Sequence, residues 1–88
     1  MASVAREITV AVHCGVHGRI AADLARITRE SGVRILLGSG NKEVDCGSIL
    51  EILSLGISEG KRIQVRVTGP SSESVLDRVC SLLTDEGH

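Results

Sequence analysis

Within residues 4–32, VAREITVAVHCGVHGRIAADLARITRESG, the spacing of the apolar side chains changes once. Over residues 4–12 they alternate with polar residues, which predicts a half-buried strand, although Arg6 falls on the apolar face. Over residues 19–32 they recur every three or four positions, which predicts an amphipathic helix that ends at a glycine. The glycine-containing segment between them, residues 13–18, is expected to be a loop.

The same two periods continue through the rest of the chain. Strands are expected over Val33–Leu37, Glu43–Cys46 and Lys61–Thr68, a turn over Gly38–Asn41, a short helix from Ser48 that stops at Gly56, and a last helix that opens at Gly69–Ser71. The element order is therefore β-α-β-β-α-β-α. We expect an α+β fold, a two-layer open-faced sandwich in which three helices cover one face of an antiparallel four-stranded sheet.

Length and composition limit the possible functions. The chain has 88 residues, which we expect to form a single domain over 1–88. Val, Ile and Leu supply 27 of them and Phe, Tyr and Trp none, so the core must be aliphatic and no aromatic ring can stack on a base. The formal net charge of −1 argues against a general nucleic-acid binder.

Targeting signals and cysteine usage indicate the compartment. The chain does not start with a cationic segment and an apolar run, so we expect no signal peptide. Uninterrupted apolar runs do not exceed three residues, so we expect no membrane insertion. Three widely spaced cysteines, Cys14, Cys46 and Cys80, are typical of free thiols in a reducing compartment. The expected location is the cytoplasm.

The loop before the first helix holds the strongest candidate for chemistry. His17 is expected at the helix N-terminus, where backbone N–H groups lack internal partners and carry partial positive charge. Arg19 adds a permanent charge with donor geometry suited to phosphate, and Gly18 allows a ligand to approach the backbone. Together these residues indicate a phosphohistidine site. The alternative is that His17 merely caps the helix and Arg19 is a solvated surface charge.

The second helix offers a different candidate. Residues 48–51 have the S-x-x-E pattern of a capping box, so Ser48 is either an ordinary N-cap or a phosphorylation site at a helix N-terminus. The helix that follows is apolar on more sides than one short helix can bury. We therefore expect an exposed apolar patch for a partner, formed by Ile49, Leu50 and Leu53.

Two further patterns occur in the same loop. His13, Cys14 and His17 lie close in sequence, but their spacing fits no closed zinc site, and we expect neither a metal nor a cofactor. Residues 15–18 also spell G-x-x-G, which resembles the loop of the KH module that binds single-stranded nucleic acid. A KH domain, however, has a strand and a helix before that loop, whereas the residues here predict one strand.

Three motifs together resemble the HPr family, the histidine phosphocarriers of the bacterial phosphoenolpyruvate-dependent sugar phosphotransferase system. Gly15–Arg19, GVHGR, is similar to the G-L-H-x-R active-centre motif of that family. Cys46–Leu50, CGSIL, and Ser54–Ile57, SLGI, are similar to its regulatory-serine helix and the end of that helix. The resemblance covers roughly residues 5–84 and implies the same element order as the periodicity.

The resemblance implies a carrier rather than a classical enzyme. His17 would accept a phosphoryl group from enzyme I and donate it to IIA-type sugar transport components. Arg19 would assist, and phosphate would also meet the backbone of Gly18 and Ile20, although the family usually has proline where this chain has Ile20. A monomer is expected.

The resemblance also implies a regulatory role for the second helix. Ser48 matches the serine that HPr kinase/phosphorylase modifies in some lineages, and Ile49, Leu50 and Leu53 match a patch that docks partners. An alternative within the same fold is a regulatory protein that transfers no phosphoryl group and acts only by binding.

Overall fold

The computed structural model describes residues 3–13 and 15–85, and the elements follow the expected order. They are β1 (Ser3–Thr9), α1 (Gly18–Ser31), β2 (Arg34–Ser39), β3 (Lys42–Asp45), α2 (Ile49–Ser54), β4 (Arg62–Thr68) and α3 (Ser72–Thr84). The four strands form one sheet in the order β1-β4-β2-β3, and every neighbouring pair is antiparallel. β1 and β3 are therefore the edges of the described sheet.

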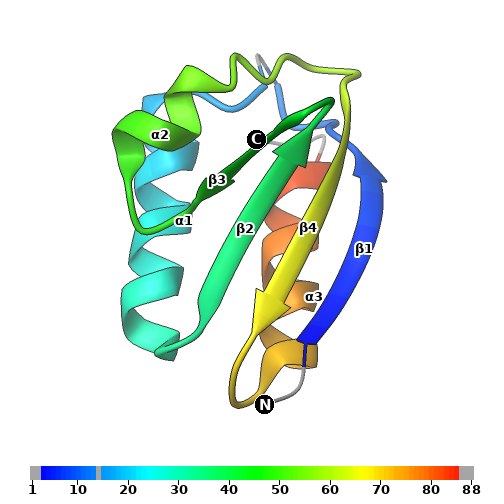
Figure 1. Ribbon diagram of the computed structural model, residues 1–88. Coiled ribbons are helices and arrows are strands. Elements are labelled where there is room, and N and C mark those ends of the chain that lie inside the picture. The colour runs from blue at the N-terminus through cyan, green and yellow to red at the C-terminus, as the bar shows by residue number, and fades with distance from the viewer. Residues whose placement is uncertain (1–2, 14, 86–88) are drawn as a thin grey trace.

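The three helices lie on the same side of the sheet, which leaves its other face open (Figure 1). α1 and α3 lie behind the strands and run in opposite directions, and α3 packs against β1 and β4. α2 packs against α1 and β3, close to the start of α1 (Figure 1). The expected α+β open-faced sandwich is confirmed.

Burial follows the predicted periods. In the central strand β4 the buried residues are Ile63, Val65 and Val67, and the exposed ones are Arg62, Gln64 and Arg66. α1 buries one stripe, Ile20, Ala21, Leu24, Ala25 and Ile27. All of these side chains except Ala25 belong to one aliphatic cluster between the layers, which also includes Cys46. Burial, reinforced by the nearby Asp45, raises the pKa of the Cys46 thiol to about 12, so this cysteine remains a neutral core residue.

The first strand is shorter than predicted, because β1 ends at Thr9 rather than Val12. Beyond it the chain bends toward the end of α3, where the backbone N–H groups of Ala11 and Val12 both donate to the Leu83 carbonyl, at 2.9 and 3.1 Å. The last carbonyls of a helix lack intrahelical donors, so this contact satisfies one of them. Burial still alternates along residues 10–12 although the strand has ended, because Val12 points into the core.

Other boundaries also move by one or two residues. Gly18 is the first residue of α1 rather than part of the loop, and Gly38 and Ser39 belong to β2, so that the hairpin turn is Gly40 and Asn41. β3 ends at Asp45, before Cys46. Cys14 and His88 lie outside the described residues. No helix in the described part of the chain is long and apolar enough to cross a membrane.

Arg6, the exception in the first strand, has a partner on a distant element. Its guanidinium donates to the carboxylate of Asp77 on α3 at 2.9 Å, and the Arg6 and Asp77 side chains are 48% and 66% exposed. Because β1 is an edge strand, Arg6 can extend past the sheet to solvent while its stem lies beside α3. Arg6 therefore fits the apolar face without burying its charge.

Candidate functional site

His17 is the N-cap of α1. Its backbone is extended, with φ −114° and ψ −173°, and its carbonyl accepts the first helical hydrogen bond from the Ala21 N–H at 2.8 Å. The side chain is exposed and makes no capping hydrogen bond among the described residues. The alternative in which the imidazole caps the helix is therefore not what the structure has. The ring is available to react with an external group.

The first turn of α1 has no acidic residue to neutralise the helix dipole. The leading N–H groups of a helix, here those of Gly18, Arg19 and Ile20, lack acceptors within the helix. These groups therefore offer hydrogen-bond donors and partial positive charge beside His17. This arrangement favours an anion attached to, or held against, the imidazole.

The three residues that follow His17 differ in what they can contribute. Arg19 is exposed, and its side chain makes no ion pair or hydrogen bond within residues 3–13 and 15–85. It is free to contact a phosphoryl group. Ile20 is buried in the core, so only its backbone N–H can serve a ligand. A β-carbon at Gly18 would meet no described atom within 4 Å, so the approach to the backbone there is open.

The loop that carries His17 is attached to the segment after α2. The Val16 N–H donates to the Ile57 carbonyl at 2.9 Å, and the Gly60 N–H donates to the Val10 carbonyl at 2.7 Å. Gly15 has a φ of +72°, and a β-carbon at this position would collide with the backbone of residues 57–59. The site is therefore built from two segments that lie about forty residues apart in sequence.

Ser48 is confirmed as the N-cap of α2. Its Oγ accepts a hydrogen bond from the Glu51 N–H at 3.3 Å. The Ser48 N–H donates to the Asp45 carbonyl, so the reciprocal bond of a capping box is replaced by a contact to β3. The Asp45 carboxylate accepts a hydrogen bond from the Gly47 N–H at 2.7 Å. Ser48 thus lies between two acidic residues.

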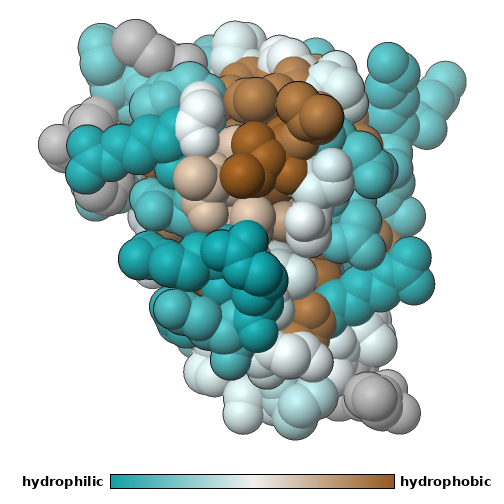
Figure 2. All heavy atoms as spheres, turned by 90° about the vertical axis from the view of Figure 1, so that its left-hand side faces the viewer, coloured by the Kyte–Doolittle hydropathy of each residue, from teal (hydrophilic) through white to brown (hydrophobic). Residues whose placement is uncertain are grey.

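The apolar patch predicted on α2 is exposed. Viewed from the side of α2, the surface has one compact hydrophobic area surrounded by hydrophilic residues (Figure 2). Its large exposed side chains are Ile49, Leu50 and Leu53, of which Leu50 is 80% exposed and the others about 40%. Ile52, in contrast, is fully buried and anchors the helix. We call Ile49, Leu50 and Leu53 the α2 patch.

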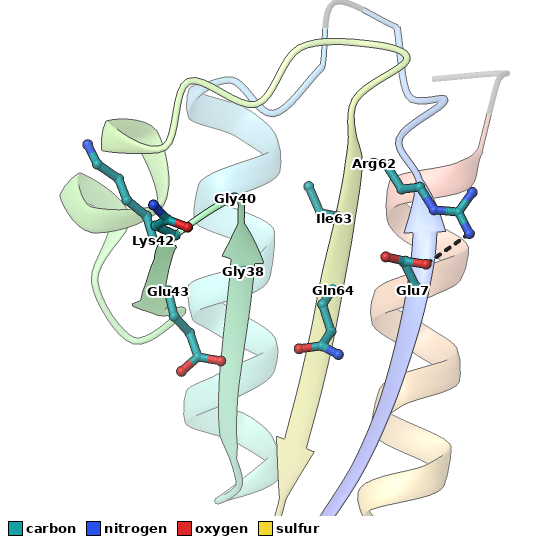
Figure 3. Close-up of a pocket in the computed structure, with 9 residues that line it drawn as sticks. Glu7, Gly38, Gly40, Lys42, Glu43, Arg62, Ile63 and Gln64 are labelled. Atoms are coloured by element: carbon teal, nitrogen blue, oxygen red, sulfur yellow. Dashed lines mark ion pairs between the residues drawn. The ribbon is translucent and has the colours of Figure 1, made fainter.

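The open face of the sheet has a shallow hollow that contains none of the predicted site residues (Figure 3). It forms where Gly38 provides no side chain between Glu43 and Gln64, its neighbours across the strands. At the rim Arg62 and Glu7 form an ion pair of 2.9 Å. The hollow is polar and its charges are balanced, so it offers no reactive group comparable to His17.

Metal ligands do not converge in the described part of the chain, where no group of three His, Cys, Asp or Glu residues could hold an ion. Of the three residues weighed for a metal, Cys14 is outside the described residues. His13 is exposed, and its Nδ1 lies 4.0 Å from the Glu59 carboxylate. A second histidine with a different environment therefore lies four residues before His17.

Sequence patterns missed two features of the site. The contact of Gly15 with residues 57–59 and the two bonds to the Leu83 carbonyl join segments that are distant in the chain. The glycine at residue 15 was a partial indication of this contact, because glycine is favoured where φ is positive or where another backbone approaches closely. Nothing in the sequence identified its partner.

Comparisons with known proteins agree with this geometry. Residues 4–85 match the family model described as the PTS HPr component phosphorylation site. The phosphocarrier protein NPr of Shewanella violacea is 30% identical over 83 residues, 94% of this chain and 91% of that protein. The phosphocarrier protein HPr of Xylella fastidiosa is 28% identical over 76 residues, 86% of this chain and 85% of that protein. A crystal structure of HPr from Bacillus anthracis matches with a TM-score of 0.87 at 25% identity, covering 94% of this chain and 99% of that one.

Proposed function

The chain belongs to the HPr family of phosphotransferase-system phosphocarriers, and from this premise we propose that His17 is the residue that carries the phosphoryl group. The observation that carries the assignment is the start of α1. An exposed imidazole there makes no capping bond within the described chain, and the turn after it has free N–H groups and no acid. The G-x-x-G pattern of residues 15–18 then belongs to the β1–α1 loop and the first residue of α1 in an HPr fold rather than to a KH domain.

The proposed reaction is an in-line transfer between two histidines. A ring nitrogen of neutral His17 attacks the phosphorus of a phosphohistidine on enzyme I, and the new N–P bond forms as the donor N–P bond breaks. The donor imidazole leaves with the electron pair of the broken bond and takes up a proton from solvent, while the proton on the other ring nitrogen of His17 passes to solvent, so that the protons balance. Transfer to the acceptor repeats these steps with His17 as the donor.

The residues after His17 would stabilise the transferred group. The N–H groups of Gly18, Arg19 and Ile20 point toward the helix start, where negative charge on the phosphoryl oxygens is favoured. The Arg19 guanidinium, which has no partner among the described residues, can donate two hydrogen bonds to the same oxygens. Ile20 contributes an N–H that proline at this position would lack.

The partners we propose are enzyme I as donor and a IIA-type component as acceptor, both in the cytoplasm. The α2 patch would dock them, since α2 packs beside α1 and a partner covering the patch would also face the start of α1 (Figure 1). Sugar-specific IIA components are the first acceptors to test. No cofactor is required for the transfer itself.

Intact mass spectrometry tests the assignment directly. The protein is mixed with phosphoenolpyruvate, Mg²⁺ and its cognate enzyme I. We expect one acid-labile phosphoryl group on the wild-type chain and none on His17→Ala. His13→Ala is the matched control, because it removes an exposed histidine of the same loop and should leave phosphorylation intact. An unphosphorylated wild-type chain would overturn the proposal and favour the regulatory protein that acts only by binding.

We further propose Ser48 as a site of regulatory phosphorylation, for example by an HPr kinase/phosphorylase. Ser48 immediately precedes the α2 patch, so added charge would fall on the docking surface. The phosphomimetic Ser48→Asp should weaken binding to enzyme I, measured by titration calorimetry. Equal affinities of Ser48→Asp and Ser48→Asn would exclude a charge effect at this position.

A further inference from the structure

Given that His17 carries the phosphoryl group, we propose that Gly15 is a positioning residue for the transfer. Gly15 lets the segment after α2, residues 57–60, approach closely enough to fix the backbone beside His17. This inference rests on the proposed function of His17, but it concerns a residue that touches neither the phosphoryl group nor the partner.

The approach at Gly15 leaves no room for a side chain. A β-carbon there would lie 2.5 Å from the Ile57 carbonyl oxygen, 2.7 Å from the Ser58 α-carbon and 2.9 Å from the Glu59 nitrogen. All three are backbone atoms, so rotating a side chain cannot relieve the contact. The φ of +72° at Gly15 adds a second requirement for glycine.

The close approach of Gly15 to residues 57–59 allows a backbone hydrogen bond to form next to His17. The N–H of Val16, the residue before His17, donates to the Ile57 carbonyl at 2.9 Å. The side chains of Val16 and Ile57 are both buried, at 8% and 3% exposure, so the bond is anchored in the core on both sides. The Gly60 N–H fixes the other end of the loop through the Val10 carbonyl.

Phosphoryl transfer is sensitive to this placement. A side chain at Gly15 has to move the two segments apart by roughly 1 Å to restore an ordinary van der Waals distance to the Ile57 carbonyl. The displacement would reach His17 through Val16. Misplacement of a reacting group by about 1 Å can cost about a hundredfold in rate. The α2 patch, on a separate helix, would keep its docking surface.

The test is Gly15→Ala in rapid-quench transfer from phosphorylated enzyme I, at varied concentrations of the variant. We expect the maximal transfer rate to fall about tenfold or more, and the half-saturating concentration to change by less than about twofold. Gly40→Ala is the matched control. Gly40 has a φ of +60° in the β2–β3 turn and no described atom within 4 Å of its β-carbon position, so it reports backbone strain alone. Its maximal rate should equal that of the wild type.

A second variant keeps the test decisive if Gly15→Ala does not fold. Replacing Val16 by its α-hydroxy acid turns the amide into an ester, which deletes the N–H that bonds to Ile57 and retains every side chain. It should also lower the maximal rate. The positioning role would be overturned if the ester variant or folded Gly15→Ala kept the maximal rate of the wild type. It would also be overturned if only the half-saturating concentration changed. Absence of phosphorylation in the wild type would instead refute the function of His17.

Discussion

The starts of α1 and α2, two helices that pack against each other, are built in opposite ways. α2 is closed by the Ser48 hydroxyl, which accepts the Glu51 N–H, and has that acid in its first turn. α1 follows His17 with no capping bond among the described residues and no acid. One end is satisfied within the chain, and the other has donors available for a ligand. An incomplete helix end of this kind suits the phosphoryl group that we propose for His17.

The same comparison separates the two proposed phosphorylation sites. On His17 a phosphoryl group would meet unpaired N–H groups and Arg19. On Ser48 it would replace a capping bond and lie beside Glu51 and Asp45, which are acidic. We therefore expect phosphate on His17 to be better stabilised than phosphate on Ser48, where Glu51 already supplies negative charge and Asp45 is paired with Arg34 at 3.6 Å.

The largest effect that we predict is on the free energy of unfolding, and it depends on the buried side chains that anchor each helix. α1 buries five residues, whereas α2 depends on Ile52 alone. Ile52→Ala should lower the free energy of unfolding by about 3 kcal/mol, because it opens a cavity beneath α2. Leu50→Ala, which truncates an 80% exposed side chain, should change it by less than about 0.5 kcal/mol. Urea titrations followed by far-UV circular dichroism measure both, and equal losses would contradict the single-anchor description.

An intermediate effect is expected if α1 is made to resemble α2. Gly18→Asp adds an acid to the first turn at a position where a side chain meets open space. The helix should gain about 0.5 kcal/mol from its dipole, while phosphorylation of His17 by enzyme I should slow about tenfold, since the new carboxylate repels the phosphoryl oxygens. Gly18→Asn is the neutral control, and a similar rate for both variants would remove the electrostatic explanation.

The smallest effect that we predict is the loss of stability when the N-cap residue of either helix is replaced. Ser48→Ala should cost about 1 kcal/mol of stability because the Glu51 N–H loses its acceptor. His17→Ala should cost less than about 0.5 kcal/mol, because the imidazole caps nothing in the described chain. Thermal unfolding of the two variants under identical conditions tests this, and a cost for His17→Ala equal to that of Ser48→Ala would show that the imidazole stabilises α1.

The sequence was sufficient to predict burial wherever the spacing of apolar residues followed a single period. Alternation over β4 and the three- to four-residue spacing over α1 predicted which faces are buried, since both patterns are local. The end of β1 was predicted wrongly at Val12, because the chain leaves the sheet there to bond to the Leu83 carbonyl. Arg6 was an exception that became explicable only with Asp77, 71 residues away.

In the candidate site, too, local features could be predicted from the sequence and contacts between distant segments could not. The helix start at His17 and the patch on α2 could be predicted because capping and amphipathic patterns depend on neighbours in sequence. The attachment of Gly15 to residues 57–59 could not, because it depends on how α2 and β4 bring a distant loop beside the site. The family resemblance supplied the motif without the contact that supports it.

The aliphatic core gives this protein an optical property that is useful in binding experiments. With no Phe, Tyr or Trp, the chain has no intrinsic fluorescence and almost no absorbance at 280 nm. A tryptophan introduced at the exposed Leu50 would be its only fluorophore, and it would lie in the middle of the α2 patch. Since Leu50 is 80% exposed, its replacement should leave the fold intact. The tryptophan emission would then change when a ligand without aromatic residues, or a protein partner that carries a quenching label, covers the patch.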